Sequence, residues 1–131
     1  MSPDEVIAYA EKVILLARDQ GKRGKELEGI YQTAAGYYYK GEFYVAKAKL
    51  AEIEASGFYA DSPKYLGDVY KLQGLIFKEL SDYKTALSYY FKGLELTSET
   101  SDMDREMIIL NIMGEVYAYH LDVENGRGYY R

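Results

Sequence analysis

The hydrophobic positions between residues 67 and 97 follow the period of an α-helix in two separate runs. Three- and four-residue steps, the spacing of one helical face, join the members of the first run: Val69, Tyr70, Gln73, Gly74 and Phe77. The same rhythm restarts in the second run: Tyr83, Ala86, Leu87, Tyr90 and Leu94. Between the runs stand Ser81 and Asp82, residue types that favour turns and helix N-caps. The stretch therefore predicts two helices joined by a tight turn.

This hairpin pattern recurs at a spacing of 40 residues. Forty residues before Gly74, Phe77, Tyr83, Ala86 and Tyr90 stand Ala34, Tyr37, Phe43, Ala46 and Leu50, and forty residues after them stand Gly114, Tyr117, Val123, Gly126 and Tyr130. Small residues coincide with small ones and large apolar residues with large ones. The central hairpin is expected to bring its helices close together at Gly74 and Ala86, with Phe77 and Tyr90 filling the space beside them.

The five marker residues of the central hairpin resemble the tetratricopeptide (TPR) repeat family. Its pattern has a small residue, an aromatic three positions later, an aromatic in the turn, an alanine opening the second helix and an aromatic one turn further on. The spacing of 40 resembles a long variant of the family, whose common form has 34 residues. Ser98 stands where the family has proline, and Gly93 where it has alanine. The resemblance implies an all-α fold, an α-α superhelix (a TPR-like solenoid of antiparallel helical hairpins) of about six helices.

The register predicts one TPR-like domain over residues 1–131. Its parts are an N-terminal half-hairpin with its linker (1–26), repeat one (27–66), repeat two (67–106) and an incomplete repeat three (107–131). Within repeat one we expect helices over 26–40 and 43–56, and the last long helix is expected over 103–120, with Ser101 and Asp102 as candidate caps. The predicted connections are 20–25, 57–61 and 99–102.

Helix starts are marked by Ser-Pro pairs. Ser2 followed by Pro3 and Glu5 predicts a capping box, and Ser62 with Pro63 repeats the cap-plus-proline signal. The inward face of the first helix is expected at Val6, Ala10, Val13 and Ala17, flanked by Ile7 and Ile14. At the other end, two glycines weaken the expected last helix, so residues 125–131 are expected to be frayed or ordered only against another element.

Composition excludes several classes of function. The formal net charge of -5 argues against phosphate neutralisation, and so against nucleic acid as a partner. The chain has no cysteine, which excludes disulfides and thiolate chemistry. No stretch approaches the ~20 apolar residues of a membrane span, so no membrane partner is expected and the cytoplasm is the expected location. Most of the 16 tyrosines are expected to pack between helices.

The residues that could carry chemistry are few. The basic segment 20–25 lacks the spacing of a phosphate-binding loop and is better explained as a helix end and loop. The alternating acids of 102–106 lack the glycine and distal glutamate of a calcium loop. His120 is the single histidine, without a second ligand or a nucleophile beside it in sequence. We therefore predict no catalytic residue, no metal and no cofactor, and the chain is not expected to be an enzyme.

The resemblance implies that the first helix of each repeat lines a concave face. Positions there that packing does not need are Tyr31, Ala35, Tyr38 and Tyr39 in repeat one, Lys71, Leu75, Lys78 and Glu79 in repeat two, and Asn111, Glu115, Ala118 and Tyr119 in repeat three. The lysine and asparagine of the family's clamp for chaperone C-termini are absent, because Tyr31 and Ala35 take their places. Tyr37 is assigned to the core because it repeats as Phe77 and Tyr117.

These observations predict a non-catalytic protein- or peptide-binding adaptor or scaffold, alone or within a larger regulator. The rings of Tyr31, Tyr38 and Tyr39 with the ammonium groups of Lys71 and Lys78 suit a peptide carrying an apolar side chain and an acidic group. The alternative for this surface is that the lysines are only solvated and that Tyr38 and Tyr39 pack against a linker.

Two other classes of function stay open: a self-associating structural protein, and a ligand-sensing domain of a transcription or signalling regulator. A homodimer is expected through apolar faces at the ends of the array. The residues assigned to those faces are Val6, Ala10 and Val13 at one end and Ile109, Ile112 and Met113 at the other.

Overall fold

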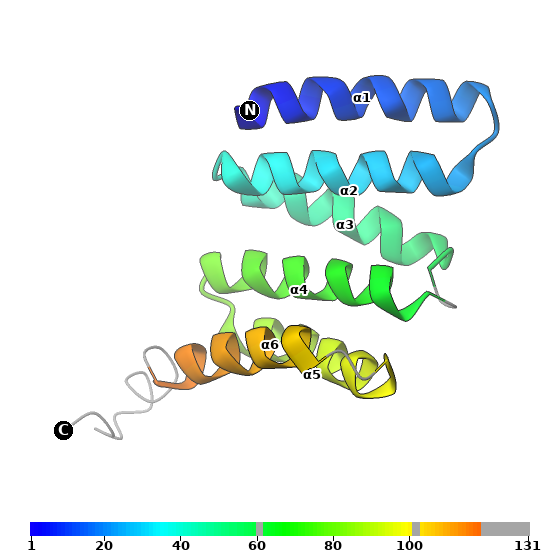
Figure 1. Cartoon of the computed structure of the whole chain (residues 1–131). Helices are drawn as coiled ribbons and strands as arrows, with labels where there is room; N and C mark the ends of the chain where they lie inside the picture. Colours follow the sequence, from blue (N-terminus) through cyan, green and yellow to red (C-terminus); the bar gives the residue numbers. More distant parts are fainter. Residues whose placement is uncertain (60–61, 101–102, 119–131) are drawn as a thin grey trace. The chain divides into compact units, whose positions relative to one another are not determined.

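Six helices make up the part of the chain that the computed structural model describes, residues 1–59, 62–100 and 103–118, and this part contains no strand (Figure 1). The helices are α1 (Pro3–Asp19), α2 (Arg23–Tyr39), α3 (Phe43–Ser56), α4 (Pro63–Glu79), α5 (Tyr83–Thr100) and α6 (Met103–Val116). Each helix begins 20 residues after the one before it. The all-α prediction with about six helices is confirmed. By its internal contacts the chain divides into two compact units, Met1–Asp61 and Ser62–Arg131.

The first unit consists of α1, α2 and α3, in which α2 packs against both of the others (Figure 1). The predicted capping box starts α1: the Ser2 hydroxyl accepts a hydrogen bond from the Glu5 N–H at 3.2 Å, and the Ser2 N–H donates to the Glu5 carboxylate at 3.2 Å. Two backbone N–H groups at the open helix end are thereby satisfied.

The inward face of α1 differs from the predicted one. Ile7, Ala10, Ile14 and Ala17 are buried, as expected for Ala10 and Ala17, whereas the prediction for Val13 is wrong because this side chain is 43% exposed. Ile7 and Ile14 take the inward positions because α2 offers glycines opposite them.

Two glycines allow α1 and α2 to lie close together. A Cβ added at Gly36 would lie 2.6 Å from Cγ1 of Ile7, and one at Gly29 would lie 2.7 Å from Cγ1 of Ile14. Such distances are too short for real carbon atoms, so only glycine fits at both positions. The helix that was expected to be half of a hairpin therefore forms an antiparallel hairpin with α2.

Three turns of the same construction join consecutive helices. In the first, the Gly21 N–H donates to the Arg18 carbonyl at 3.2 Å and the Lys22 N–H donates to the Ala17 carbonyl at 2.8 Å, the paired bonds of a Schellman motif. The other two turns repeat this pattern around Gly41 and Ser81. All three central residues are left-handed, with φ values of 66°, 83° and 63°.

The tight first turn shortens the predicted connection over 20–25. Because the left-handed Gly21 reverses the chain at once, α2 begins at Arg23 rather than at Glu26. The turns predicted at 41–42 and 80–82 are confirmed, and Asp82 caps α5 by accepting a hydrogen bond from the Thr85 N–H at 3.3 Å. Ser62 precedes α4 as expected but makes no side-chain capping bond, since its third helical residue is Tyr65 rather than a glutamate.

The second unit consists of α4, α5 and α6, and α5 packs against both neighbours (Figure 1). The predicted close approach at Gly74 is confirmed, because a Cβ there would overlap the ring of Tyr90, which has no exposed surface. Between α5 and α6 the core consists of Ala86, Leu87, Tyr90, Ile109, Met113 and Val116.

Three predictions about the end of this unit need revision. Helix α5 continues to Thr100, so residues 99 and 100 belong to the helix rather than to the predicted linker. Ile109 and Met113 are buried against α5, so the prediction that they form an uncovered face is wrong. Helix α6 ends at Val116 and continues as a π-helical turn over 117–118. The candidate caps Ser101 and Asp102, and the register positions Val123, Gly126 and Tyr130, lie outside the described residues.

Candidate functional site

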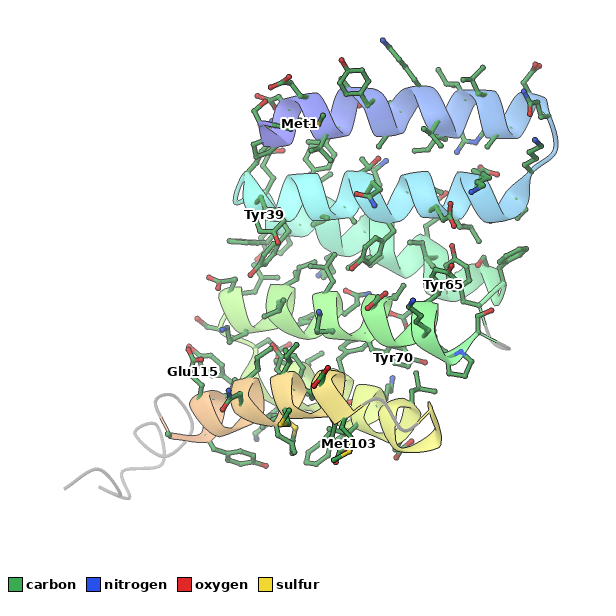
Figure 2. The ribbon with its side chains drawn as sticks, in the orientation of Figure 1. Met1, Tyr39, Tyr65, Tyr70, Met103 and Glu115 are labelled. Carbon is green, nitrogen blue, oxygen red and sulfur yellow. The ribbon has the colours of Figure 1, made fainter. Side chains whose placement is uncertain are left out.

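The outer face of α2 carries four of the predicted binding residues. Gly29 and Gly36 of α2 face α1, and Leu27, Ile30 and Ala34 are core residues. Those roles leave a remaining face with the half-buried side chains of Tyr31, Ala35 and Tyr38. Tyr39 follows at the end of the helix and is 75% exposed (Figure 2). The sequence therefore assigned these residues to a face that the α1–α2 packing does not use.

Aromatic rings gather where α2 turns into α3. The ring centroids of Tyr38 and Tyr39 lie 5.3 Å apart in an edge-to-face arrangement, and Tyr38 lies 5.7 Å from Phe43, the first residue of α3. Edge-to-face contact is a favourable geometry for aromatic pairs. Tyr38 thus has a packing role against the start of the next helix, while Tyr39 presents most of its ring outward.

The outer face of α4 carries Lys71, Leu75 and Lys78. All three are half-buried, and the spacing of seven residues places both lysines on one side of the helix. Neither lysine makes an ion pair with another residue in the described part of the chain. The face therefore holds two cations around a leucine, and Glu79 beyond them is exposed.

The predicted residues of repeat three lie on α6. Asn111 and Glu115 are exposed and line an open hollow of about 610 Å³ together with Ile108, Ile112 and Gly114. Figure 2 shows Glu115 near the end of α6 opposite to Met103. Ala118 is half-buried, and Tyr119 lies outside the described residues.

The residue assigned to the core by its repeat, Tyr37, is only half-buried, as is its equivalent Phe77, and Tyr117 is exposed. These rings sit at the edge of the helix packing rather than in its centre. The fully buried members of each repeat are smaller or lie deeper: Ala34, Ala46, Leu50, Ala86 and Tyr90.

Ion pairs close both ends of the α1–α2 hairpin. At one end the Arg18 guanidinium lies 2.6 Å from the Glu26 carboxylate, which Arg23 also contacts at 3.0 Å. At the other end Lys40 lies 2.8 Å from Asp4. The hydrogen bonds from Arg18 and then Arg23 lower the pKa of Glu26, and the hydrogen bond to Asp4 raises the pKa of Lys40. We assign these charges to holding the hairpin.

A cluster of rings across α4 and α5 was not singled out from the sequence as a group. Phe77 and Tyr89 are stacked, with centroids 5.6 Å apart and planes 11° apart, and Tyr70 lies 6.0 Å from Tyr89. The Lys92 ammonium sits 4.8 Å from the Tyr89 centroid, within the range of a cation–π contact. The three-residue step from Tyr89 to Lys92 is the signal that could have indicated it.

A shallow groove of about 210 Å³ crosses the first unit, another feature that the sequence did not indicate. Its lining comes from all three helices: Glu11, Ile14, Leu15, Arg18, Ile30, Thr33, Tyr37, Lys49 and Glu52. Acidic and basic side chains alternate at its rim, and Thr33 uses its hydroxyl to donate to the Gly29 carbonyl at 2.9 Å. The groove offers no concentration of one charge.

Within residues 1–59, 62–100 and 103–118, no group of three or more acidic, histidine or cysteine side chains is placed to hold a metal ion. Among the same residues, no helix is long and apolar enough to cross a membrane. Scans against protein-family models, curated proteins and solved structures each return no match to the chain.

Proposed function

We propose that the chain is a non-catalytic binding module of TPR type, which recognises a protein or peptide through the outer faces of its first-position helices, α2 and α4. One observation carries this proposal: the faces that the hairpins leave unused hold large aromatic rings on α2 and two lysines outside any described ion pair on α4. Aromatic side chains in particular are enriched where proteins bind partners.

The repeat itself supports this division of roles. At packing positions the side-chain size recurs, as in Ala34 with Gly74 and Ala46 with Ala86. At three outer positions the chemistry changes between repeats, from Tyr-Ala-Tyr (31, 35, 38) through Lys-Leu-Lys (71, 75, 78) to Asn-Glu-Ala (111, 115, 118). A helix whose outer residues served only solvation would not need tyrosines there, because exposed rings cost solubility.

The side chains indicate the chemistry of the partner. Tyr39 offers a flat apolar surface, and Lys71 and Lys78 offer two ammonium groups that face one way. A peptide with an aromatic or aliphatic side chain and a carboxylate would match these groups, with the rings supplying affinity and the lysines orientation. We propose that such a partner is met in the cytoplasm, within a larger assembly or regulator.

The test is selection of binding peptides from a random display library with the full chain as bait. We expect enriched sequences to contain an apolar residue and an acidic one, and the variant pairs Tyr38→Ala with Tyr39→Ala, and Lys71→Glu with Lys78→Glu, to weaken their binding by about 1–3 kcal/mol each. The matched controls are Tyr44→Ala and the pair Lys64→Glu with Lys84→Glu, which change exposed side chains elsewhere.

Two results would contradict the proposal. One is that no peptide is enriched above a bait of unrelated sequence. The other is that the enriched peptides bind the site variants and the control variants equally well. Far-ultraviolet circular dichroism of every variant checks that helix content is unchanged, so that a loss of binding reports the surface rather than the fold.

A second candidate function, self-association, is favoured by the outer side of α1. Tyr9, Val13 and Leu16 follow at helical spacing and are 56%, 43% and 61% exposed. Contiguous exposed apolar side chains often mark contacts between proteins. This stripe replaces the predicted set of Val6, Ala10 and Val13, of which Ala10 is buried against α2. Light scattering at ~100 μM decides between a dimer and a monomer.

A further inference from the structure

Helix α6 exposes an apolar stripe along one side. Met103, Met107, Leu110 and Gly114 follow at steps of four, three and four residues, which places them on one face. Met107 is 59% and Leu110 49% exposed, and a Cβ at Gly114 would meet no described atom within 4 Å. We call these four residues the α6 stripe.

The equivalent face of the preceding repeat is covered. Forty residues before Leu110 and Gly114 stand Tyr70 and Gly74 on α4. The next helix packs on both, because the ring of Tyr90 fills the space at Gly74 and the ring of Tyr89 lies 6.0 Å from Tyr70. The α6 stripe is thus the register equivalent of a face that the following helix covers.

The sequence beyond α6 carries the residues that would cover it. Forty residues after Tyr89 and Tyr90 stand Tyr129 and Tyr130. At the position of Leu87, which belongs to the core shared with α6, the chain has Arg127. A charged residue there suits a segment whose outer side meets water, as in the capping element of a repeat array.

We propose that residues 123–131, which lie outside the described residues, cover the α6 stripe, with the Tyr130 ring over Gly114 and the Tyr129 ring beside Leu110. Covering the stripe removes Met107 and Leu110 from water. The short tether to α6 gives the segment a high effective concentration at the stripe. This inference concerns the completion of the third hairpin and does not rest on the proposed peptide binding.

The same stripe could instead receive α1 of a second copy, whose exposed Tyr9 and Val13 need a partner as well. The fit at Gly114 argues against this occupant. In register, α1 has Ala10 where α5 has Tyr90, and a methyl group cannot fill the space that a phenol ring fills at Gly74. The proposal therefore commits to the chain's own segment.

The experiment is nuclear Overhauser spectroscopy on the full chain. We expect cross-peaks between the ring protons of Tyr130 and the Hα protons of Gly114 that do not change with protein concentration. A mixture of isotope-labelled and unlabelled chains should show these cross-peaks only within one chain. Their absence, cross-peaks between chains, or contacts from Tyr9 to Met107 would each overturn the proposal.

Trypsin cleavage after Arg127 gives a second readout on the full chain. We expect Tyr130→Ala, and Gly114→Leu, which fills the space from the other side, each to raise the cleavage rate about tenfold by releasing the segment. The matched control, Tyr44→Ala on the exposed side of α3, should leave the rate unchanged. Wild-type cleavage as fast as that of a free peptide spanning the same residues would contradict the proposal.

Discussion

The packing of Tyr90 on Gly74 predicts a sharp response to a single methyl group. Gly74→Ala should stabilise α4 by about 1 kcal/mol through helix propensity alone. The added Cβ, however, would lie 2.6 Å from Cδ1 and 2.8 Å from Cζ of a ring that has no exposed surface. Overpacking of a core costs about 1–3 kcal/mol, and three ring atoms within 3 Å place this case at the upper end. We expect a net loss of about 2 kcal/mol.

The chain contains its own compensating pair. Forty residues earlier the corresponding positions hold Ala34 and Leu50, both fully buried. Tyr90→Leu alone should leave a cavity and cost about 2–4 kcal/mol. Combined with Gly74→Ala it recreates the pair of repeat one, so the double variant should be more stable than the sum of the single losses predicts, by at least about 1 kcal/mol.

Urea unfolding followed by far-ultraviolet circular dichroism measures all four members of this cycle. The reasoning fails if Gly74→Ala is as stable as the wild type or more stable, because propensity would then outweigh the contact. It also fails if the double variant loses the full sum of the two single changes, because the two positions would then be independent.

Three further predictions concern charge, turn geometry and the outer side of α1. Because hydrogen bonds from the arginines lower the pKa of Glu26 below its ordinary value of 4.5, its contribution to stability is present above that value and disappears as the pH falls through the lower folded pKa; Glu26→Gln should therefore lower the urea midpoint at neutral pH and match the wild type in strong acid, and an equal difference at both pH values would refute this. Ser81 has a left-handed φ of 63°, so Ser81→Gly should stabilise the fold by about 0.5 kcal/mol and Gly41→Ser should destabilise it by about 1 kcal/mol, which thermal unfolding of the two variants tests by the opposite signs of their shifts. If copies associate through α1, Val13→Asp with Leu16→Asp should make the scattering mass at ~100 μM monomeric, whereas a wild type that is already monomeric there would exclude the association.

The hairpin architecture was open to prediction because each repeat states it twice, in helical spacing and in register. Small residues recur where backbones approach, and the central pair of Gly74 and Tyr90 could be assigned from that recurrence. The turns were predictable because Gly41, or Ser81 with Asp82, interrupts the hydrophobic period at the expected place.

The role of α1 was harder to predict, for a physical reason. Comparison at a spacing of 40 aligns α1 with α3 and α5, and so obscures its contact with α2. Valine and isoleucine also have similar hydrophobicity, so periodicity alone could not choose between Val13 and Ile14 as the inward residue. The choice depends on Gly29 and Gly36 of the neighbouring helix, which accept Ile14 and Ile7.

The candidate site was predictable only as a set of positions. Register separates packing residues from outer ones, and the structure places Tyr31, Ala35 and Tyr38 on the outer face of α2. Register does not state what an outer residue touches. The contact of Tyr38 with Phe43, and that of Lys92 with Tyr89, depend on where the next helix begins and on side-chain rotation, which helical spacing alone leaves open.

The binding proposal is tested most directly by titrating the isotope-labelled full chain with an enriched peptide and following the backbone amide resonances. The account predicts that the largest shifts fall on the outer face of α2 around Tyr38 and Tyr39 and on that of α4 between Lys71 and Lys78. Shifts confined to α1, α3 or α5, with the α2 and α4 faces unperturbed at saturation, would contradict it.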